Sequence, residues 1–205
     1  DRAYQKATYL KGTENFNKED YPQAVSMFEK SLAVPVDSRY VGEASFWLAE
    51  TYSIGKRYEE ALPHYEKALA IPGLPANLVT QLRYGLGYAH YNLQHYDRAV
   101  VSFREYTNRG TKDPNYLDGL LRLADCLYVL KSYGEALSAY RKVIDLKSPD
   151  SEYAHLQAGN ILMIQRQYGQ AENELSAVAN NSGSRYADEA RFQLGQLALE
   201  QSNYP

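Results

Sequence analysis

The chain contains four histidines and one cysteine, the side chains that most often bind metal ions or act as nucleophiles. None of the histidines (His64, His90, His95 and His155) belongs to a His-Glu-x-x-His motif, and no Cys-x-x-Cys is present. These are the spacings with which helices and loops commonly bind zinc. His90 and His95 lie on opposite sides of an expected helix–turn boundary. The sequence therefore predicts no metal site and no cofactor.

Residues 84–87, Tyr-Gly-Leu-Gly, begin like a dinucleotide-binding loop. Such a loop needs a third glycine and must follow a strand, whereas this segment lies inside an expected helix, where packing explains the glycines better. Cys126 lies in an apolar helical stretch, which favours a buried thiol over a reactive one. Acidic side chains such as Glu50 and Asp125 are expected on solvated helix faces. We therefore expect no catalytic residue and no enzymatic activity.

Tyrosine recurs at a regular spacing. The pair Tyr-x-x-Ala begins at Tyr21, Tyr58, Tyr96, Tyr133 and Tyr168, and a sixth tyrosine, Tyr204, precedes the end of the chain. The steps between these tyrosines are 37, 38, 37, 35 and 36 residues. A period of this length indicates stacked supersecondary units in place of a single globular core.

A small residue stands nine positions before each tyrosine: Gly12, Ala49, Gly87, Ala124, Gly159 and Gly195. Glycine inside a helix costs about 1 kcal/mol relative to alanine. Its recurrence at one register therefore indicates that a partner helix approaches closely. We expect the contact to be made by the alanine of the following helix (Ala24, Ala99 or Ala171), and all six small residues to be buried.

Within the second repeat, Ser38 is expected to cap the first helix, and the second helix is expected to start near Tyr58. Proline and glycine at 72–73 then end that helix. The same reasoning along the chain predicts an all-α array of about eleven antiparallel helices over residues 1–205. Its repeats are expected at about 2–36, 37–74, 75–112, 113–149 and 150–183, with a half repeat at 184–205.

In each of the first four repeats an aromatic residue follows the Tyr-x-x-Ala alanine by four positions: Phe28, Tyr65, Phe103 and Tyr140. Together with the preceding small residue, this order resembles the tetratricopeptide repeat along essentially the whole chain. The periods exceed that family's length of about 34 residues. Its tryptophan position is filled by Thr8, Ser45, Arg83, Leu120, His155 and Arg191. The resemblance implies a right-handed α-α superhelix that binds protein or peptide partners.

The starts of two repeats, residues 38–49 and 184–195, look similar to bacterial cell-envelope repeat proteins, namely outer-membrane assembly lipoproteins and Tol-Pal coordinators. This second resemblance implies a periplasmic or outer-membrane-associated protein. The chain begins without methionine and ends within a repeat, so we expect it to be a fragment of a larger protein. The alternative function is therefore a regulatory or substrate-docking region of a larger enzyme or sensor.

Family members usually bind peptides on the concave surface of the first helices. Mapping this surface onto the repeat register gives the expected groove residues Tyr9, Phe46, Glu50, Tyr84, Tyr88, Tyr91, Leu121, Asp125, Tyr128 and Asn160. Tyrosine suits such a wall because it combines apolar area with a hydrogen-bonding tip, although the same tyrosines could simply pack between helices. Chaperone-type members clamp a terminal carboxylate, but Lys6 alone cannot build that clamp, and acidic groove residues would repel the carboxylate.

Composition limits the class of partner further. A net charge of −3 and a pI near 5.9 give no basic footprint, so nucleic acid is not expected as a partner. No run reaches the roughly 18 apolar residues of a membrane span. The helix expected at 184–202 carries Phe192, Leu194, Leu197 and Leu199, and the helix that should cover it would begin at Tyr204. We therefore expect this helix either to pack on a neighbouring molecule, which would give self-association, or to fray.

Overall fold

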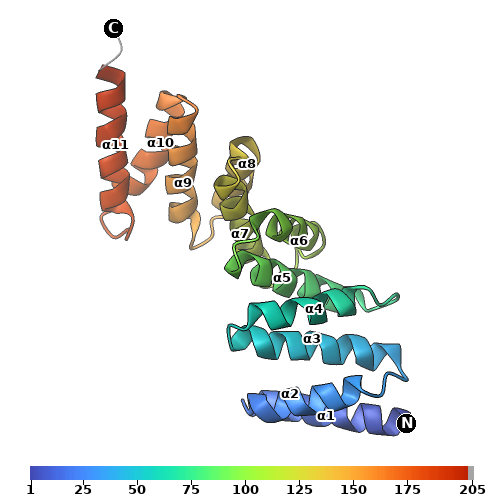
Figure 1. Ribbon diagram of the computed structural model, residues 1–205. Helices are drawn as coiled ribbons and strands as arrows, with labels where there is room; N and C mark the ends of the chain where they lie inside the picture. The colour runs from blue at the N-terminus through green and yellow to red at the C-terminus, as the bar shows by residue number, and fades with distance from the viewer. Residues whose placement is uncertain (203–205) are drawn as a thin grey trace. The chain divides into compact units, whose positions relative to one another are not determined.

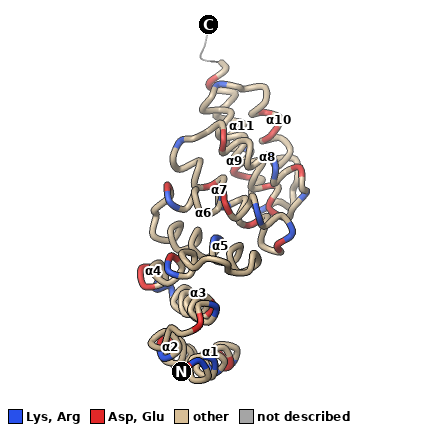
Figure 2. The backbone as a smooth tube through the Cα atoms, turned by 90° about the vertical axis from the view of Figure 1, so that its right-hand side faces the viewer, with Lys and Arg blue, Asp and Glu red and all other residues tan. Residues whose placement is uncertain are grey.

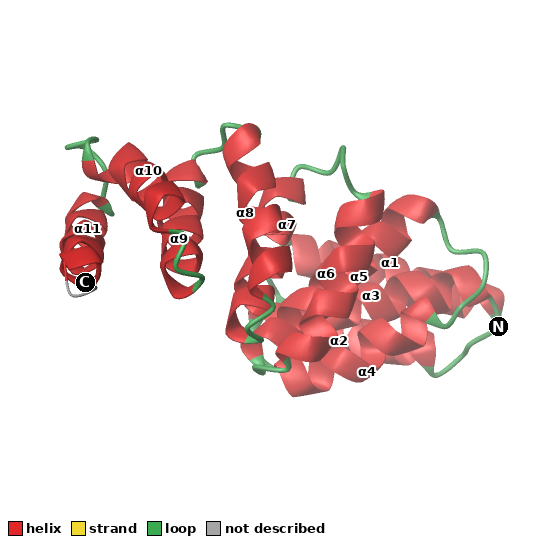
Figure 3. Cartoon of the chain, turned by 90° about the horizontal axis from the view of Figure 1, so that it is seen from above, coloured by secondary structure: helices red, strands yellow, loops and turns green. Residues whose placement is uncertain are grey.

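The computed structural model describes residues 1–202, and every regular element in this range is an α-helix (Figure 3). The helices are α1 (Arg2–Asn17), α2 (Tyr21–Leu32), α3 (Ser38–Ile54), α4 (Tyr58–Leu69), α5 (Ala76–Asn92), α6 (Tyr96–Arg109), α7 (Tyr116–Val129), α8 (Tyr133–Asp145), α9 (Ser151–Ile164), α10 (Tyr168–Ala179) and α11 (Ala187–Ser202). The predicted all-α class and the eleven helices are confirmed. Tyr204, and with it the helix expected to begin there, lies outside the described residues.

The chain forms two compact units, and the boundary between them in the sequence falls after Lys112. The first contains α1 to α6 and the second contains α7 to α11. In the first unit each helix packs against the next, and Figure 1 shows them stacked in order. The odd-numbered helices also contact one another, α1 with α3 and α3 with α5. They therefore form a continuous row. In the second unit α9 contacts α11 in the same way.

One turn geometry joins the two helices of every repeat. The residue two positions before each repeat tyrosine has a positive φ of 58 to 61°: Glu19, Lys56, Gln94, Lys131 and Arg166. The next amide then donates to a carbonyl five residues earlier, as Arg57 N does to Tyr52 O at 2.9 Å. Of the two hydrogen bonds that close a Schellman-type helix end, this is the one that spans more residues of the chain. Because all five turns repeat it, the spacing from the small residue to the tyrosine stays constant.

Three of the small residues, Gly12, Gly87 and Gly159, face a larger side chain than the expected alanine. A β-carbon placed on Gly12 would lie 2.6 Å from the ring of Phe28, and one on Gly87 would lie 2.8 Å from the ring of Phe103. The predicted partner alanine was therefore wrong. The contact is made one turn later, by the residue that fills the space left by the absent side chain. Five of the six small residues are buried, and Gly195 is exposed with no atom within 4 Å of its β position.

The start of α3 is capped by Asp37 and not by Ser38. The Asp37 side chain accepts a hydrogen bond from the backbone amide of Arg39 at 3.0 Å, and Ser38 is already helical. Asp37 suits the position because a carboxylate satisfies an amide at the helix start that has no helical partner. The second helix of this repeat, α4, begins at Tyr58 as predicted, and Gly73 lies beyond its end with a φ of 75°.

Charged residues of both signs are mixed along each compact unit (Figure 2). No helix within residues 1–202 is long and apolar enough to cross a membrane. The thiol of Cys126 is buried, as expected, and burial raises its pKa to about 12. On α11, Leu197 is buried, whereas Phe192 and Leu199 are exposed.

Candidate functional site

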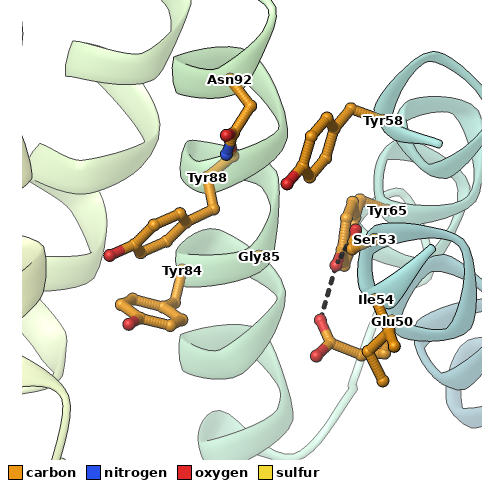
Figure 4. Close-up of a pocket in the computed structure, with 9 residues that line it drawn as sticks. All are labelled: Glu50, Ser53, Ile54, Tyr58, Tyr65, Tyr84, Gly85, Tyr88 and Asn92. Carbon is orange, nitrogen blue, oxygen red and sulfur yellow. Dashed lines mark hydrogen bonds between the residues drawn. The ribbon is translucent and has the colours of Figure 1, made fainter. Parts of the chain in front are cut away.

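A hollow of about 280 Å³ opens in the first compact unit between the helices of two successive repeats (Figure 4). Helix α3 contributes Glu50, Ser53 and Ile54; α4 contributes Tyr58 and Tyr65; α5 contributes Tyr84, Gly85, Tyr88 and Asn92. Four of these nine side chains are tyrosines, and Glu50 is the only one with a formal charge at neutral pH. An aromatic wall with a few polar groups is typical of ligand-binding clefts.

Glu50 is held by a hydrogen-bond chain on one wall of the hollow. The Tyr65 hydroxyl donates to Oε1 of Glu50 at 2.5 Å, and the Ser53 hydroxyl lies 3.0 Å from the Tyr65 oxygen. Since Tyr65 gives its only proton to Glu50, Ser53 donates to Tyr65. Burial raises the pKa of Glu50, and the Tyr65 hydrogen bond opposes that rise. The expectation that Glu50 is solvated was wrong, because the stacked helices enclose its carboxylate.

Gly85 allows α4 and α5 to approach closely at this site. A β-carbon on Gly85 would lie 2.6 to 2.7 Å from Cε1, Cζ and the hydroxyl oxygen of Tyr65. Gly85 therefore contacts the preceding repeat, whereas Gly87 contacts Phe103 of its own repeat. The packing interpretation of residues 84–87 is confirmed, and both glycines of the segment have a structural role.

Tyr84 and Tyr88 form the opposite wall, and both are half-buried. Their rings lie 4.9 Å apart, centroid to centroid, in an edge-to-face arrangement. Tyr84 also packs 5.0 Å from Tyr106, and Tyr88 packs 5.6 Å from Phe103. Aromatic neighbours on α6 thus hold both rings in place. The structure brings together three of the predicted groove residues here, namely Glu50, Tyr84 and Tyr88.

Other predicted groove residues of the first unit lie away from this hollow. Tyr91 packs against Tyr96, with ring centroids 6.0 Å apart, and Tyr9 packs against Tyr40, with ring centroids 5.4 Å apart. Neither Tyr91 nor Tyr9 lines the hollow. Phe46 is 6 % exposed and belongs to the hydrophobic core. Leu121, in the second unit, is 4 % exposed. A partner could not contact Phe46 or Leu121 without displacing packed helices.

Asp125 in the second unit is buried, so the expectation of a solvated side chain was wrong here too. Its Oδ1 accepts hydrogen bonds from the hydroxyls of Tyr140 at 2.8 Å and Tyr153 at 3.1 Å. Its Oδ2 accepts one from Nη1 of Arg122 at 2.7 Å. Burial raises the pKa of Asp125, and these three partners act in the opposite direction. Asp125 therefore links the helices within its unit.

Tyr128 and Asn160 line a second hollow, of about 290 Å³, within the second compact unit. Met163, Ile164, Gln193 and Glu200 complete its lining. The side-chain oxygen Oδ1 of Asn160 is buried without a hydrogen-bond partner. This hollow contains one tyrosine, whereas the first hollow contains four.

The sequence prediction missed Tyr58, Tyr65 and Asn92, which also line the first hollow. A spacing in the sequence could have identified Tyr65. It follows Glu50 by 15 residues, and Tyr140 follows Asp125 by the same 15 residues. In both cases the tyrosine hydroxyl donates to the acid. In the described part of the chain no group of three or more histidine, cysteine or acidic residues could hold a metal ion.

The family model described as "Tetratricopeptide repeat" matches residues 9–75 and 84–151. A curated relative, the small glutamine-rich tetratricopeptide repeat-containing protein 2 of Saccharomyces cerevisiae, is 32% identical over 99 residues. That alignment covers 48% of this chain and 27% of the relative, so the chain spans about a quarter of the relative's length.

Two similar solved structures support the same fold. YrrB, described as a TPR protein with an unusual peptide-binding site, has a TM-score of 0.70 at 19% identity. The match covers 94% of this chain and 89% of the YrrB chain. A MamA structure has a TM-score of 0.67 at 17% identity, and the match covers 100% of this chain and 97% of the MamA chain. None of these relatives is described as an outer-membrane assembly lipoprotein or a Tol-Pal coordinator, so the expected cell-envelope type gains no support from them.

Proposed function

The chain belongs to the tetratricopeptide repeat family, and on that basis we propose that it is a non-enzymatic scaffold that binds a peptide or protein partner in the hollow between α3, α4 and α5. Repeat proteins of this kind generally mediate protein–protein interaction. The observation that carries the proposal is the set of three half-buried tyrosines, Tyr58, Tyr84 and Tyr88, that line the hollow together with Glu50. Tyr65 is fully buried and holds the Glu50 carboxylate through its hydroxyl. Tyrosine is enriched at protein interfaces because its ring buries apolar area while its hydroxyl stays hydrogen-bonded.

The arrangement of the hollow supports peptide binding in two further ways. Tyr84 and Tyr88 are fixed by their neighbours on α6, so little side-chain entropy remains to be lost on binding. Gly85 lets the Tyr65 ring pack directly against the backbone of α5, which holds the two walls of the hollow at a fixed separation. The similarity to YrrB, whose description mentions a peptide-binding site, agrees with this function, although its site is a property of that protein.

The test begins with a random peptide library displayed against the immobilised protein. The affinity of a recovered peptide is then measured by fluorescence anisotropy for the parent protein and two variants, Tyr58→Ala and Tyr96→Ala. Both tyrosines start the second helix of their repeat and both are half-buried, but only Tyr58 lines the hollow. We expect Tyr58→Ala to weaken binding about tenfold or more, because central aromatic residues dominate interface energies.

Tyr96→Ala is the matched control, and we expect it to change the affinity by less than about twofold. Melting temperatures of both variants show whether each remains folded under the conditions of the measurement. Failure of the parent protein to retain any peptide would count against the proposed function. Equal affinity of the parent and Tyr58→Ala would place binding outside this hollow.

A further inference from the structure

The Glu50 carboxylate lies in the aromatic hollow without a counter-ion among the residues that the structure describes. Tyr65 donates a hydrogen bond to it, and no basic side chain of residues 1–202 forms an ion pair with it. None of the nine residues lining the hollow is basic. Figure 4 shows the carboxylate pointing into the space between α3–α4 and α5. Partial burial disfavours the ionised form of this carboxyl group, and a cation beside it would offset that cost.

The equivalent acid in the fourth repeat shows what Glu50 lacks. Asp125 occupies the same register, 15 residues before a tyrosine that donates to it. Three residues before Asp125, on the same helix, Arg122 supplies the cation at 2.7 Å. The corresponding residue before Glu50 is Trp47, which carries no charge. The second repeat thus keeps the tyrosine–carboxylate pair of the fourth but lacks its internal arginine.

The rings around Glu50 favour a cation in the same place. The electron-rich faces of tyrosine attract ammonium and guanidinium groups, and this attraction strengthens where water is excluded. Tyr58, Tyr84 and Tyr88 are half-buried and line the hollow that contains the carboxylate. The ring of Tyr65 is fully buried, and only its hydroxyl serves the site, as the donor to Glu50. An anionic side chain would be repelled by Glu50, and a purely apolar one would leave the carboxylate without a charged partner. Charge and aromatic surface therefore select the same ligand class.

We propose that this hollow receives a basic side chain, arginine or lysine, of the partner peptide. The guanidinium or ammonium group pairs with the Glu50 carboxylate, and its alkyl stem lies against the tyrosine rings. This inference rests on the proposed peptide-binding function and specifies the chemistry that the site recognises. The partner's cation takes the place that Arg122 occupies beside Asp125.

The direct test uses small probes and the folded chain. N-acetyl-arginine N-methylamide, its lysine counterpart and its citrulline counterpart are each titrated into ¹⁵N-labelled protein. Citrulline has the shape of arginine but carries no charge. We expect saturable shifts of the backbone amides of Tyr84, Gly85 and Tyr88 with the two cations and not with citrulline. Equal shifts with citrulline, or no saturable shift with either cation, would overturn the inference.

Two variants identify the carboxylate responsible. Glu50→Gln keeps an acceptor for the Tyr65 hydroxyl but removes the charge, and we expect it to weaken binding of the arginine probe about tenfold or more. Glu59→Gln makes the same change at an exposed position on α4 outside the hollow, and it should leave binding unaltered. Unaltered binding by Glu50→Gln would overturn the inference. The citrulline comparison needs no variant and holds even if Glu50→Gln folds poorly.

Selected peptides separate this inference from the proposed function. We expect peptides recovered by the parent protein to share an arginine or lysine, and replacement of that residue by citrulline or norleucine to weaken binding. Peptides that bind at the hollow without a basic residue would refute the cation and leave the proposed function standing. If no peptide is recovered, the proposed function fails, and the probe titration still decides whether the hollow binds a cation.

Discussion

Replacing Asp125 with alanine is expected to lower the free energy of unfolding by about 2–4 kcal/mol. The variant would leave the hydroxyl of Tyr140, which is 1 % exposed, without its acceptor, and would remove the acceptor of Tyr153 as well. It would also deprive Arg122 of its close ion-pair partner. Urea unfolding followed by circular dichroism measures the change.

Two variants calibrate the Asp125 measurement. Asp125→Asn keeps an acceptor for a tyrosine hydroxyl, so we expect a smaller loss, of about 1 kcal/mol. Glu172→Ala removes an exposed carboxylate from α10 and is expected to change stability by less than about 0.5 kcal/mol. A loss from Asp125→Ala no larger than that from Glu172→Ala would show that the Asp125 hydrogen bonds contribute nothing to stability.

The same comparison has a defined pH dependence. Burial holds the pKa of Asp125 above its ordinary value in the folded protein. A carboxyl group with a raised folded pKa binds its proton more tightly when folded, so its contribution to stability is greatest below the unfolded pKa and is lost as pH rises through the folded pKa. We therefore expect the parent protein to gain stability relative to Asp125→Asn as pH falls from neutral towards about 4.

Replacing Gly159 with alanine is expected to lower the free energy of unfolding by about 1–2 kcal/mol. Alanine is favoured over glycine inside a helix by about 1 kcal/mol, so propensity alone predicts the opposite sign. The added β-carbon, however, would lie 2.6 Å from Cγ of Leu175, whose side chain is fully buried. Cγ is the branch point of that side chain and not its flexible end, so relief requires α9 and α10 to separate.

Gly195 provides the matched control, because it occupies the same register one repeat later. Within residues 1–202, no atom other than those of its chain neighbours and its own helix backbone lies within 4 Å of its β position. There we expect alanine to raise the free energy of unfolding by about 0.5–1 kcal/mol, through helix propensity alone. Opposite signs at Gly159 and Gly195 would establish that the recurring glycines are retained for helix contact. A stabilising effect at both positions would contradict this account of the repeat.

The sequence predicted the helix pairs well because their determinants recur at fixed positions. Tyr-x-x-Ala and the small residue nine positions earlier define which helix packs on which. The turn conformation was not predictable, since Lys56 and its equivalents have no special preference for a positive φ. The contact partner of each glycine was also misassigned. A register of small residues identifies the neighbouring helix but not which of its larger side chains fills the gap.

The candidate site was predictable only in part. Mapping the family's groove onto the first helices found Glu50, Tyr84 and Tyr88, but that mapping considers only first helices and so missed Tyr58 and Tyr65 on α4. It also gave equal weight to residues that share a register. Phe46 and Tyr84 occupy equivalent positions in their repeats, yet Phe46 is buried in the core, where its ring centroid lies 5.1 Å from that of Trp47. Burial depends on such individual neighbours, which the period does not encode.

The most direct measurement of the central claim is a map of where a selected peptide contacts the protein. Addition of the unlabelled peptide to ¹⁵N-labelled protein should produce its largest amide shifts at residues that line the first hollow, among them Glu50, Tyr84, Gly85 and Tyr88. Shifts concentrated instead on the second hollow, around Asn160 and Met163, would contradict the proposed site.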